Sequence, residues 1–371
     1  MGWMRLALLL CIAGEARTGP VPGAQQLSKD NNFPFIYEYI EEANKDKAIP
    51  VLLKDGDIAV DLYRNGRICR RCQWSKNKNG TTQIPYVIDP RYSRSDTSLI
   101  NEALKEFEVM TCVQFVQRSS ESDYLYIQSG SGCWSYIGKI FGKQTVSLES
   151  PKCMVYGVIQ HEAMHNIGFF HEHSRTDRDD YVDILWDNIE PDATSNFDIN
   201  DGNTLDLPYD YTSLMHYPMY TYSIRPNLPT LVPKPDPIIP IGQRTGMSNL
   251  DVMKINAYYN CNLCRKKLME TSGSFSGNSL FAKQYDGNCL WLIQVPKGKI
   301  LLQVYYLKIF STDYIKVYDG VTNSSPVLLD KTFGSKLILP LVSSGRNMLV
   351  EFVTKGNSIL SEFDATYVTV S

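Results

Sequence analysis

The sequence predicts an α+β domain followed by an all-β sandwich, with a short export signal in front of both. Three features carry this prediction. An apolar run follows a single positive charge at the N-terminus. Helical and strand-like patterns are mixed between residues 65 and 263. Short β-type runs, separated by Gly, Asn and Ser turns, then fill residues 264–371 without a helical pattern.

The bulk composition is ordinary for a folded protein and limits the classes of partner. Apolar residues make up 43% of the chain and charged residues 21%. The net charge is −3, from 37 basic and 40 acidic side chains, and no basic block stands out. We therefore expect no nucleic-acid partner. The composition does not fix an oligomeric state.

Residues 1–18 are typical of a secretory signal peptide. Arg5 precedes an apolar run from Leu6 to Ala13, which is too short to span a bilayer, and a polar flank follows. No later segment has about 18 consecutive apolar residues. We therefore expect a secreted, extracellular protein with no membrane span.

The cysteines indicate disulfide bonds. One of the nine, Cys11, lies in the signal, which leaves an even number in an exported chain. The sequence alone leaves their pairing open. Cys69 and Cys72 form a C-x-x-C pair, a spacing also typical of redox and zinc sites. Because no second such pair lies near it, a small structural loop is the favoured interpretation.

Residues 19–64 predict a linker or pro-segment. They are polar, contain no cysteine, and hold too little apolar mass for a core of their own. A short helix is expected at residues 35–46.

The next region begins with a strand at residues 83–90 that ends at proline. A helix with an Asp/Ser cap at its start follows, and a strand is expected from Cys112, with another at residues 123–130. The helix is predicted by apolar residues at helical spacing: Leu99, Ile100, Ala103, Leu104 and Phe107. From about residue 170 the chain is mostly loop, until a closing capped helix at residues 247–261.

Between these elements lies a second helix that ends at Gly168 and carries the chemistry. His161 and His165 are four residues apart, so both imidazoles lie on one face and can bind one metal ion. Glu162 beside them can reach a water on that ion. Gly168 lets the chain leave the helix in a left-handed conformation, and His171 can then return to the same ion. Three histidines and a water form an open catalytic zinc site.

The complete pattern is far more specific than its parts. H-E-x-x-H alone arises by chance at roughly one position in tens of thousands, and Gly168 with His171 multiplies that rarity roughly a thousandfold. Two bland interpretations are a helix with solvated or core histidines and a site that has lost its activity. The first is disfavoured because all five histidines lie in this part of an exported, disulfide-bonded chain. The second is disfavoured because Glu162 and all three ligands are present. Downstream, Met215 and Tyr217 lie in "SLMHY", where methionine would ordinarily be a core residue.

The pattern H-E-x-x-H-x-x-G-x-x-H followed by a methionine turn is that of the metzincins. In its extended form, with "SLMHY" and "PIGQRTGMSNLDVMKINAYYNC", it closely resembles the astacin family of zinc endopeptidases over residues 65–261. The resemblance implies a two-lobed catalytic domain. "RNGRICRRCQW" and "IPIGQRTGMS" are most similar to the hatching-enzyme subgroup.

The resemblance implies a role for each site residue. His161, His165 and His171 would bind one zinc ion, and Glu162 would be the general base that activates the water. Tyr217 would be an extra ligand that swings away to hydrogen-bond the oxyanion.

Further residues would support this site. Met215 would form its apolar floor, and Glu172 would meet the mature N-terminus. The resemblance also implies the disulfides Cys112–Cys261 and Cys133–Cys153, with Cys69 and Cys72 closing on each other.

Residues 19–64 resemble the family's inhibitory pro-segment. In "KDGD", Asp57 would take the water's place on zinc, although Lys54 stands where the family has an aromatic residue. On composition alone the motif would be an ordinary Gly-Asp turn. Cleavage between Arg64 and Asn65 would release the segment.

Residues 264–371 resemble a CUB domain through "DYIKVYDG" and the spacing of Cys264 and Cys289. The second cysteine pair usual in such domains is missing. Of the three acidic residues that hold calcium in many CUB domains, only Asp313 has a match, and Lys308 and Lys355 occupy the other positions. We expect no calcium there and a substrate-docking or spacer role.

The leading hypothesis is a secreted zinc endopeptidase, made as a zymogen, that cuts extracellular or egg-envelope proteins. A tolloid-like processing protease for growth-factor or matrix precursors is the alternative within the enzyme class. A different class is a binding protein whose CUB domain does the work while the zinc site is vestigial.

Overall fold

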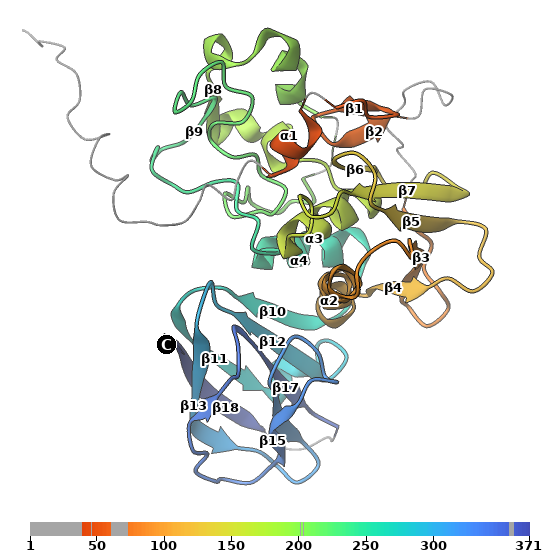
Figure 1. Cartoon of the computed structure of the whole chain (residues 1–371). Helices are drawn as coiled ribbons and strands as arrows, with labels where there is room; N and C mark the ends of the chain where they lie inside the picture. Colours follow the sequence, from red (N-terminus) through yellow and green to blue (C-terminus); the bar gives the residue numbers. More distant parts are fainter. Residues whose placement is uncertain (1–38, 46, 61–72, 201, 203, 356–359) are drawn as a thin grey trace, which may run out of the picture. The chain divides into compact units, whose positions relative to one another are not determined.

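The computed structural model describes residues 39–371 except 46, 61–72, 201, 203 and 356–359. The expected signal peptide, the Arg64–Asn65 cleavage site and the pair Cys69 and Cys72 lie outside the described residues. Mixed helices and strands lead up to Cys264 and strands dominate after it (Figure 1). This confirms the expected α+β domain followed by an all-β sandwich.

A seven-stranded sheet organises the α+β region. In spatial order it contains β1 (Leu52–Lys54), β2 (Ile58–Val60), β6 (Cys133–Tyr136), β7 (Lys143–Leu148), β5 (Tyr124–Gln128), β3 (Thr82–Ile88) and β4 (Val113–Gln117). The strands β3, β4, β5 and β7 run parallel, whereas β6 is antiparallel to β7. Of the catalytic region's own strands, β6 is therefore the one that faces the segment before residue 61.

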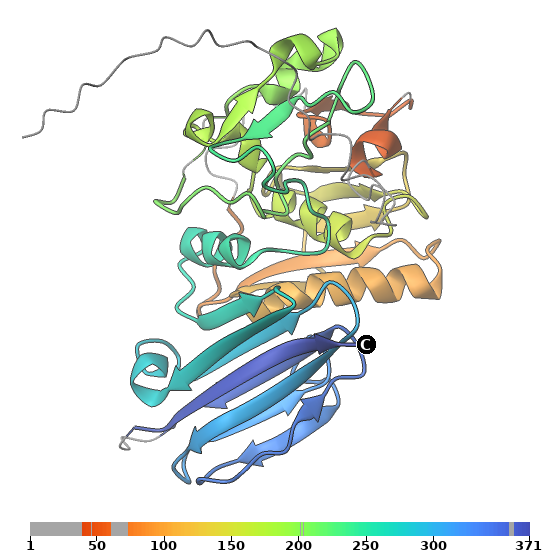
Figure 2. The same ribbon diagram turned by 90° about the vertical axis from the view of Figure 1, so that its left-hand side faces the viewer.

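Helix α2 (Arg94–Met110) packs an apolar stripe against this sheet (Figure 2). The hydroxyl of Ser93 caps its first turn by accepting from the backbone N–H of Asp96. The five apolar residues that predicted the helix lie on its inner side, and four of them are buried. Glu106 is also buried, which the apolar spacing did not predict.

Helix α3 (Tyr156–Asn166) is buried along its whole length and carries the first two histidines. The long segment after it contains four short 3-10 helices and the strand pair β8 (Val182–Ile184) and β9 (Leu231–Pro233), within a largely irregular chain. Helix α4 (Asn249–Tyr258) closes the region, capped by Ser248 and Asp251 in a reciprocal capping box.

The C-terminal region is a sandwich of two sheets with its own buried core. One sheet has the order β10 (Cys264–Leu268), β12 (Asn288–Gln294), β17 (Asn347–Val353), β14 (Tyr314–Tyr318) and β15 (Val327–Thr332). The other has the order β11 (Ser272–Asn278), β18 (Glu362–Val370), β13 (Lys299–Lys308) and β16 (Leu341–Val342). A short helix, α5 (Ser279–Ala282), follows β11.

Three disulfides hold the described chain together. Cys112–Cys261 and Cys133–Cys153 lie in the α+β region, and Cys264–Cys289 joins β10 to β12. These are the pairings that the family resemblance implies. No helix among the described residues is long and apolar enough to cross a membrane.

The segment before residue 61 is folded against the catalytic region. Helix α1 (Tyr39–Asn44) and the β1–β2 hairpin lie beside β6 (Figure 1), and β2 pairs with β6 in parallel. The amide of Asn44 accepts from the backbone N–H of Cys133 at 2.8 Å and donates to its carbonyl, also at 2.8 Å. It also donates to the carbonyl of Gly56 at 2.9 Å. One side chain thus fixes both the helix and the hairpin turn.

Candidate metal centre

The three motif histidines meet at one point. Helix α3 places the rings of His161 and His165 4.7 Å apart between centroids. Gly168 then adopts φ +106°, and its backbone N–H donates to the carbonyl of His165, which ends the helix. The ring of His171 returns to within 5.2 Å of His161 and 4.8 Å of His165. The expected turn between ligands is therefore present.

The carboxylate of Asp57 lies among these rings. Its oxygens are 3.1 Å from Nε2 of His161, 3.4 Å from Nε2 of His165 and 3.2 Å from Nε2 of His171. All four side chains are buried, and their potential ligand atoms lie within 4.8 Å of one another. Asp57 comes from the β1–β2 turn, about a hundred residues before the histidines.

These donors fit a bound cation. The Nδ1–H of His161 donates to the carbonyl of Leu214 at 2.9 Å, and that of His165 donates to the carbonyl of Phe169 at 2.7 Å. With Nδ1 protonated, the Nε2 lone pairs of the neutral rings point at a carboxylate. Burial lowers the pKa of His161 to about 3, so that ring stays neutral. A positive ion bound between these Nε2 lone pairs and the carboxylate of Asp57 removes the electrostatic repulsion between them.

Glu162 has an unsatisfied carboxylate beside this cluster. The side chain is fully buried, and neither Oε1 nor Oε2 has a hydrogen-bond partner within the described part of the chain. Burial, followed by the charge of Asp57, raises the pKa of Glu162 well above its usual range. Burying a carboxylate without hydrogen-bond partners lowers the stability of the fold. The same carboxylate is well suited to proton transfer.

Tyr217 packs against the rings of His171 and His173. Its ring centroid is 4.7 Å from that of His171 and 3.8 Å from that of His173, on which it stacks. Its hydroxyl donates to the backbone carbonyl of Asp55. The phenol is thus held by the same turn that delivers Asp57.

Met215 and Glu172 are linked through the backbone. Met215 is buried, and its carbonyl accepts from the N–H of Glu172 at 2.9 Å. The carboxylate of Glu172 accepts from Lys254 Nζ at 2.6 Å on both oxygens and from the N–H of Asp210 at 2.9 Å. The expected partner of Glu172, the amino group of Asn65, lies outside the described residues.

Several site neighbours carried no signal in the sequence. Lys254 occurs within a helix pattern, where a lysine is ordinarily solvated, but it is buried on Glu172. Arg244 is buried and donates to the carbonyls of Leu214 and His216 on either side of Met215. In the sequence, only the family resemblance of "IPIGQRTGMS" covers this arginine. His173, which had no predicted role, is buried against Tyr217.

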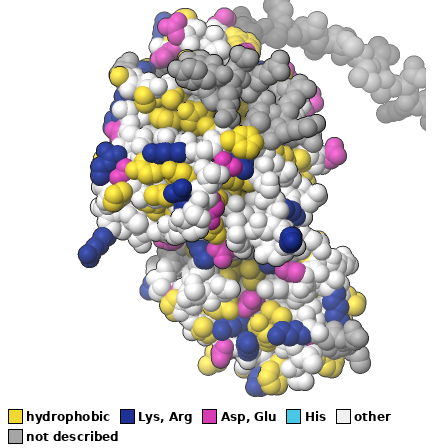
Figure 3. Space-filling model, turned by 90° about the vertical axis from the view of Figure 1, so that its right-hand side faces the viewer, with side chains coloured by type: hydrophobic (Ala, Val, Ile, Leu, Met, Phe, Trp, Pro, Cys, Tyr) yellow, Lys and Arg dark blue, Asp and Glu magenta, His cyan; other side chains and the backbone are white. Residues whose placement is uncertain are grey.

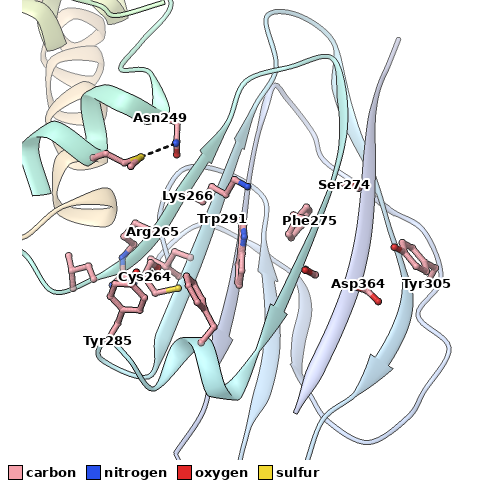
Figure 4. Close-up of a pocket in the computed structure, with 15 residues that line it drawn as sticks. Asn249, Cys264, Arg265, Lys266, Ser274, Phe275, Tyr285, Trp291, Tyr305 and Asp364 are labelled. Atoms are coloured by element: carbon pink, nitrogen blue, oxygen red, sulfur yellow. Dashed lines mark hydrogen bonds between the residues drawn. The ribbon is translucent and has the colours of Figure 1, made fainter. Parts of the chain in front are cut away.

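Little open space remains over the centre. A cavity of about 20 Å³ lies between Asp57, Tyr217 and Arg244, and its wall includes Ile40 and Glu41 of α1. All five histidines are buried, and none shows on the face in Figure 3. A groove of about 600 Å³ lies elsewhere, between Asn249 of α4 and the strands around Trp291 (Figure 4).

Comparison with known families identifies this architecture. Residues 71–260 match the family model "Astacin", which describes a peptidase family. The chain belongs to the astacin family. Residues 264–367 of this astacin match the CUB domain model, so its C-terminal sandwich is a CUB domain.

The relatives of this astacin cover from about half to nearly the whole of the chain. The astacin-like metalloendopeptidase of Gallus gallus is 43% identical over 348 residues, which are 92% of this chain and 84% of the relative. High choriolytic enzyme 2 of Oryzias latipes is 44% identical over 212 residues, covering 57% of this chain and 76% of the relative. The solved structure of High choriolytic enzyme 1 from the same fish, a hatching-enzyme zinc protease, matches with TM-score 0.50 and 45% identity. It covers 51% of this chain and 95% of that structure.

These relationships confirm that the chain is a zinc metalloendopeptidase of the astacin type. A more distant relative, bone morphogenetic protein 1 of Xenopus laevis, is 35% identical over 302 residues. This astacin spans only 42% of that relative.

Proposed function

We propose that this astacin is a secreted zymogen whose active form cuts egg-envelope or other extracellular proteins. The observation that carries the proposal is the position of Asp57 among His161, His165 and His171, delivered by a segment that precedes the catalytic region. Residues 1–18 would be the signal peptide and residues 19–64 the pro-segment. The catalytic domain would span residues 65–263 and the CUB domain residues 264–371.

The site residues have separate roles in this proposal. His161, His165 and His171 hold zinc, which when bound supplies a Lewis acid and lowers the pKa of water toward neutrality. Glu162 takes the proton from the attacking water and passes it to the leaving amine, because its carboxylate is buried without a competing partner. Tyr217 donates its hydroxyl to the developing oxyanion once Asp55 no longer accepts it.

Latency has two physical components. The carboxylate of Asp57 takes the place of the water among the histidines. The β1–β2 hairpin also pairs with β6, so the edge of the catalytic sheet is covered. When the hairpin leaves, β6 becomes a free edge, and an extended substrate can add to it as a strand.

Activation would follow cleavage between Arg64 and Asn65. The new amino group would compete with Lys254 for the buried carboxylate of Glu172. This exchange would connect maturation to Met215, whose carbonyl is bonded to Glu172.

The CUB domain is proposed to function without calcium. The carboxylate of Asp313 is already satisfied, since it accepts from Ser361 Oγ at 2.7 Å and from the N–H of Lys355 at 3.0 Å. The ammonium groups of Lys308 and Lys355 cannot ligate a cation.

The choriolytic relatives favour an egg-envelope substrate, because their names describe action on the chorion. A tolloid-like processing role is the second candidate, favoured by the relative at 35% identity. Cleavage-site profiling of the activated chain on egg-envelope proteins and on procollagen-type precursors separates the two. Preferential cleavage of the precursors would favour the second.

Glu162→Gln tests the catalytic proposal. The amide keeps the shape of the side chain but cannot accept a proton, so kcat should fall by at least roughly a hundredfold. Zinc content and the thermal unfolding midpoint should be unchanged. A variant that hydrolyses peptides at the normal rate would exclude Glu162 as the base. The conservative change Glu270→Gln, at an exposed position that remains in the activated enzyme, is the matched control.

A further inference from the structure

A lysine of the CUB domain is buried in the catalytic domain. Lys267 of β10 places Nζ 2.6 Å from Oε1 of Glu106 in α2, and both side chains are fully excluded from solvent. A buried ion pair of this kind is weak as a source of stability. Removal of one partner, however, leaves an uncompensated charge in the interior. The pair therefore makes the CUB domain necessary to the packing around Glu106.

The second oxygen of Glu106 connects this pair to the catalytic helix. The hydroxyl of Tyr156 donates to Oε2 of Glu106 at 2.7 Å. Tyr156 is the first residue of α3, and the N-cap residue Val155 makes no side-chain cap. The side chain of Tyr156 therefore ties the start of the helix that carries His161 to Glu106.

A second CUB side chain reaches the same tyrosine. The guanidinium of Arg346 lies 5.8 Å from the ring centroid of Tyr156. Close packing continues next to His161, where Gln160 Oε1 accepts from the N–H of Met247 at 3.0 Å. A Cβ added at Gly246 would meet both Gln160 Oε1 and Lys267 Nζ at 3.2 Å.

The CUB domain also supports α2 directly. Helix α2 has no basic residue in its last turn, and Arg265 of β10 supplies one by donating to the carbonyl of Val109 at 3.1 Å. Apolar CUB residues join the catalytic core: Leu290, Leu292, Tyr318, Val321 and Leu349. The contact is thus continuous with the core that packs α2 against α3.

We propose that Lys267 is a positioning residue for catalysis, acting through Glu106 and Tyr156 on helix α3. The CUB domain is then a fixed part of the active enzyme, in addition to any docking or spacer role. The side chain of Lys267 fixes the orientation of Glu106, Glu106 fixes Tyr156, and Tyr156 sets where α3 presents His161 and Glu162.

A set of full-length variants, measured after activation, tests this role. Lys267→Met keeps the side-chain length and removes the charge, and we expect kcat to fall on the order of tenfold with KM unchanged. Lys267→Met with Glu106→Gln removes both charges and keeps an acceptor for Tyr156, so it should recover most of kcat. Tyr156→Phe should lower kcat while the ion pair stays intact. Lys266→Met, on the exposed side of the same strand, is the matched control.

A purely structural role would give a different result. It predicts that each variant loses stability while kcat, measured well below the unfolding midpoint, stays at the wild-type value. A folded Lys267→Met variant with normal kcat overturns the proposal. If Lys267→Met does not fold, Tyr156→Phe and the double variant decide, and normal kcat in Tyr156→Phe overturns it equally.

Discussion

Asp57 shows how one residue can hold a catalytic centre in an inactive state. Its carboxylate faces three Nε2 atoms at 3.1–3.4 Å, in the place that an open catalytic site reserves for water. The motif "KDGD" predicted this position by family resemblance, although Lys54 departs from the family. In the structure Lys54 Nζ donates to Asn200 Oδ1 at 2.6 Å, so this side chain makes a polar contact.

Asp57→Ala should give the unprocessed chain measurable activity. Loss of the carboxylate removes the contact that excludes water, and we expect a rise on the order of tenfold, equivalent to about 1.4 kcal/mol. Peptide hydrolysis by the unprocessed chain, with processing checked on a gel, is the measurement. Glu42→Gln should leave latency unchanged. If Asp57→Ala were as silent as the wild type, coverage of β6 alone would account for latency.

Asp89 provides a pH test away from the metal. Hydrogen bonds from Arg91 hold its pKa well below the ordinary value of 3.8, and the hydroxyl of Tyr126 also donates to its carboxylate. This depressed pKa contributes stability that is present above the ordinary value and is lost as pH falls through the folded-state value. Asp89→Asn should therefore unfold at lower denaturant than wild type at pH 7.

The difference between the two unfolding midpoints should shrink when the measurement is repeated at pH 3. Asp187→Asn, at an exposed position, is the matched control. An equal gap at both pH values would contradict the depressed pKa.

At the scale of elements, the sequence predicted the three longer helices. Helices α2, α3 and α4 fall where the helical patterns place them, and α4 has its predicted cap, at Ser248. Helix α2 begins earlier than predicted, since its cap is Ser93 and the Asp/Ser cap was expected within "DTSL". The hairpin β1–β2 and the pair β8–β9 were not predicted, because strands of three residues carry too little pattern and depend on tertiary partners. The burial of Lys254 and Lys267 could not be predicted either. Each lysine is paired with a carboxylate far away in the sequence, and the residues around the lysine give no sign of that partner.

Gly157→Ala tests the packing of α3. In an exposed helix this change would favour folding by about 1 kcal/mol. Here a Cβ would lie 2.0 Å from the carbonyl oxygen of Arg244, which is backbone and cannot move aside cheaply. We expect a net loss of about 1–3 kcal/mol in the free energy of unfolding, measured by denaturant titration. Gly345→Ala, with open space around its Cβ, should be near neutral. Equal effects would contradict the close approach.

At the scale of the whole molecule, three parts converge on one site. The segment before residue 61 covers it, the catalytic domain builds it, and the CUB domain supports its helix. The family resemblance predicted the first two roles. The third was not predictable, because "CRKKL" has the composition of a solvent-exposed strand.

Zinc should leave the unprocessed chain more slowly than the activated enzyme. In the unprocessed form Asp57 adds a fourth donor, and the remaining cavity of about 20 Å³ has room for one water at most. Zinc transfer to a chromophoric chelator measures both rates. The rate for Asp57→Ala, before processing, should lie between them. Identical rates for the two wild-type forms would show that the segment does not shield the ion.

The two disulfides at the junction have a consequence for the proteolysis of this chain. Only Asn262 and Leu263 separate Cys261, bonded to Cys112, from Cys264, bonded to Cys289. A foreign protease must draw an extended stretch of substrate into its cleft, and two residues fixed at both ends cannot supply one. The enzyme should therefore persist as a single polypeptide from the catalytic domain through the CUB domain, and degradation should begin at other loops.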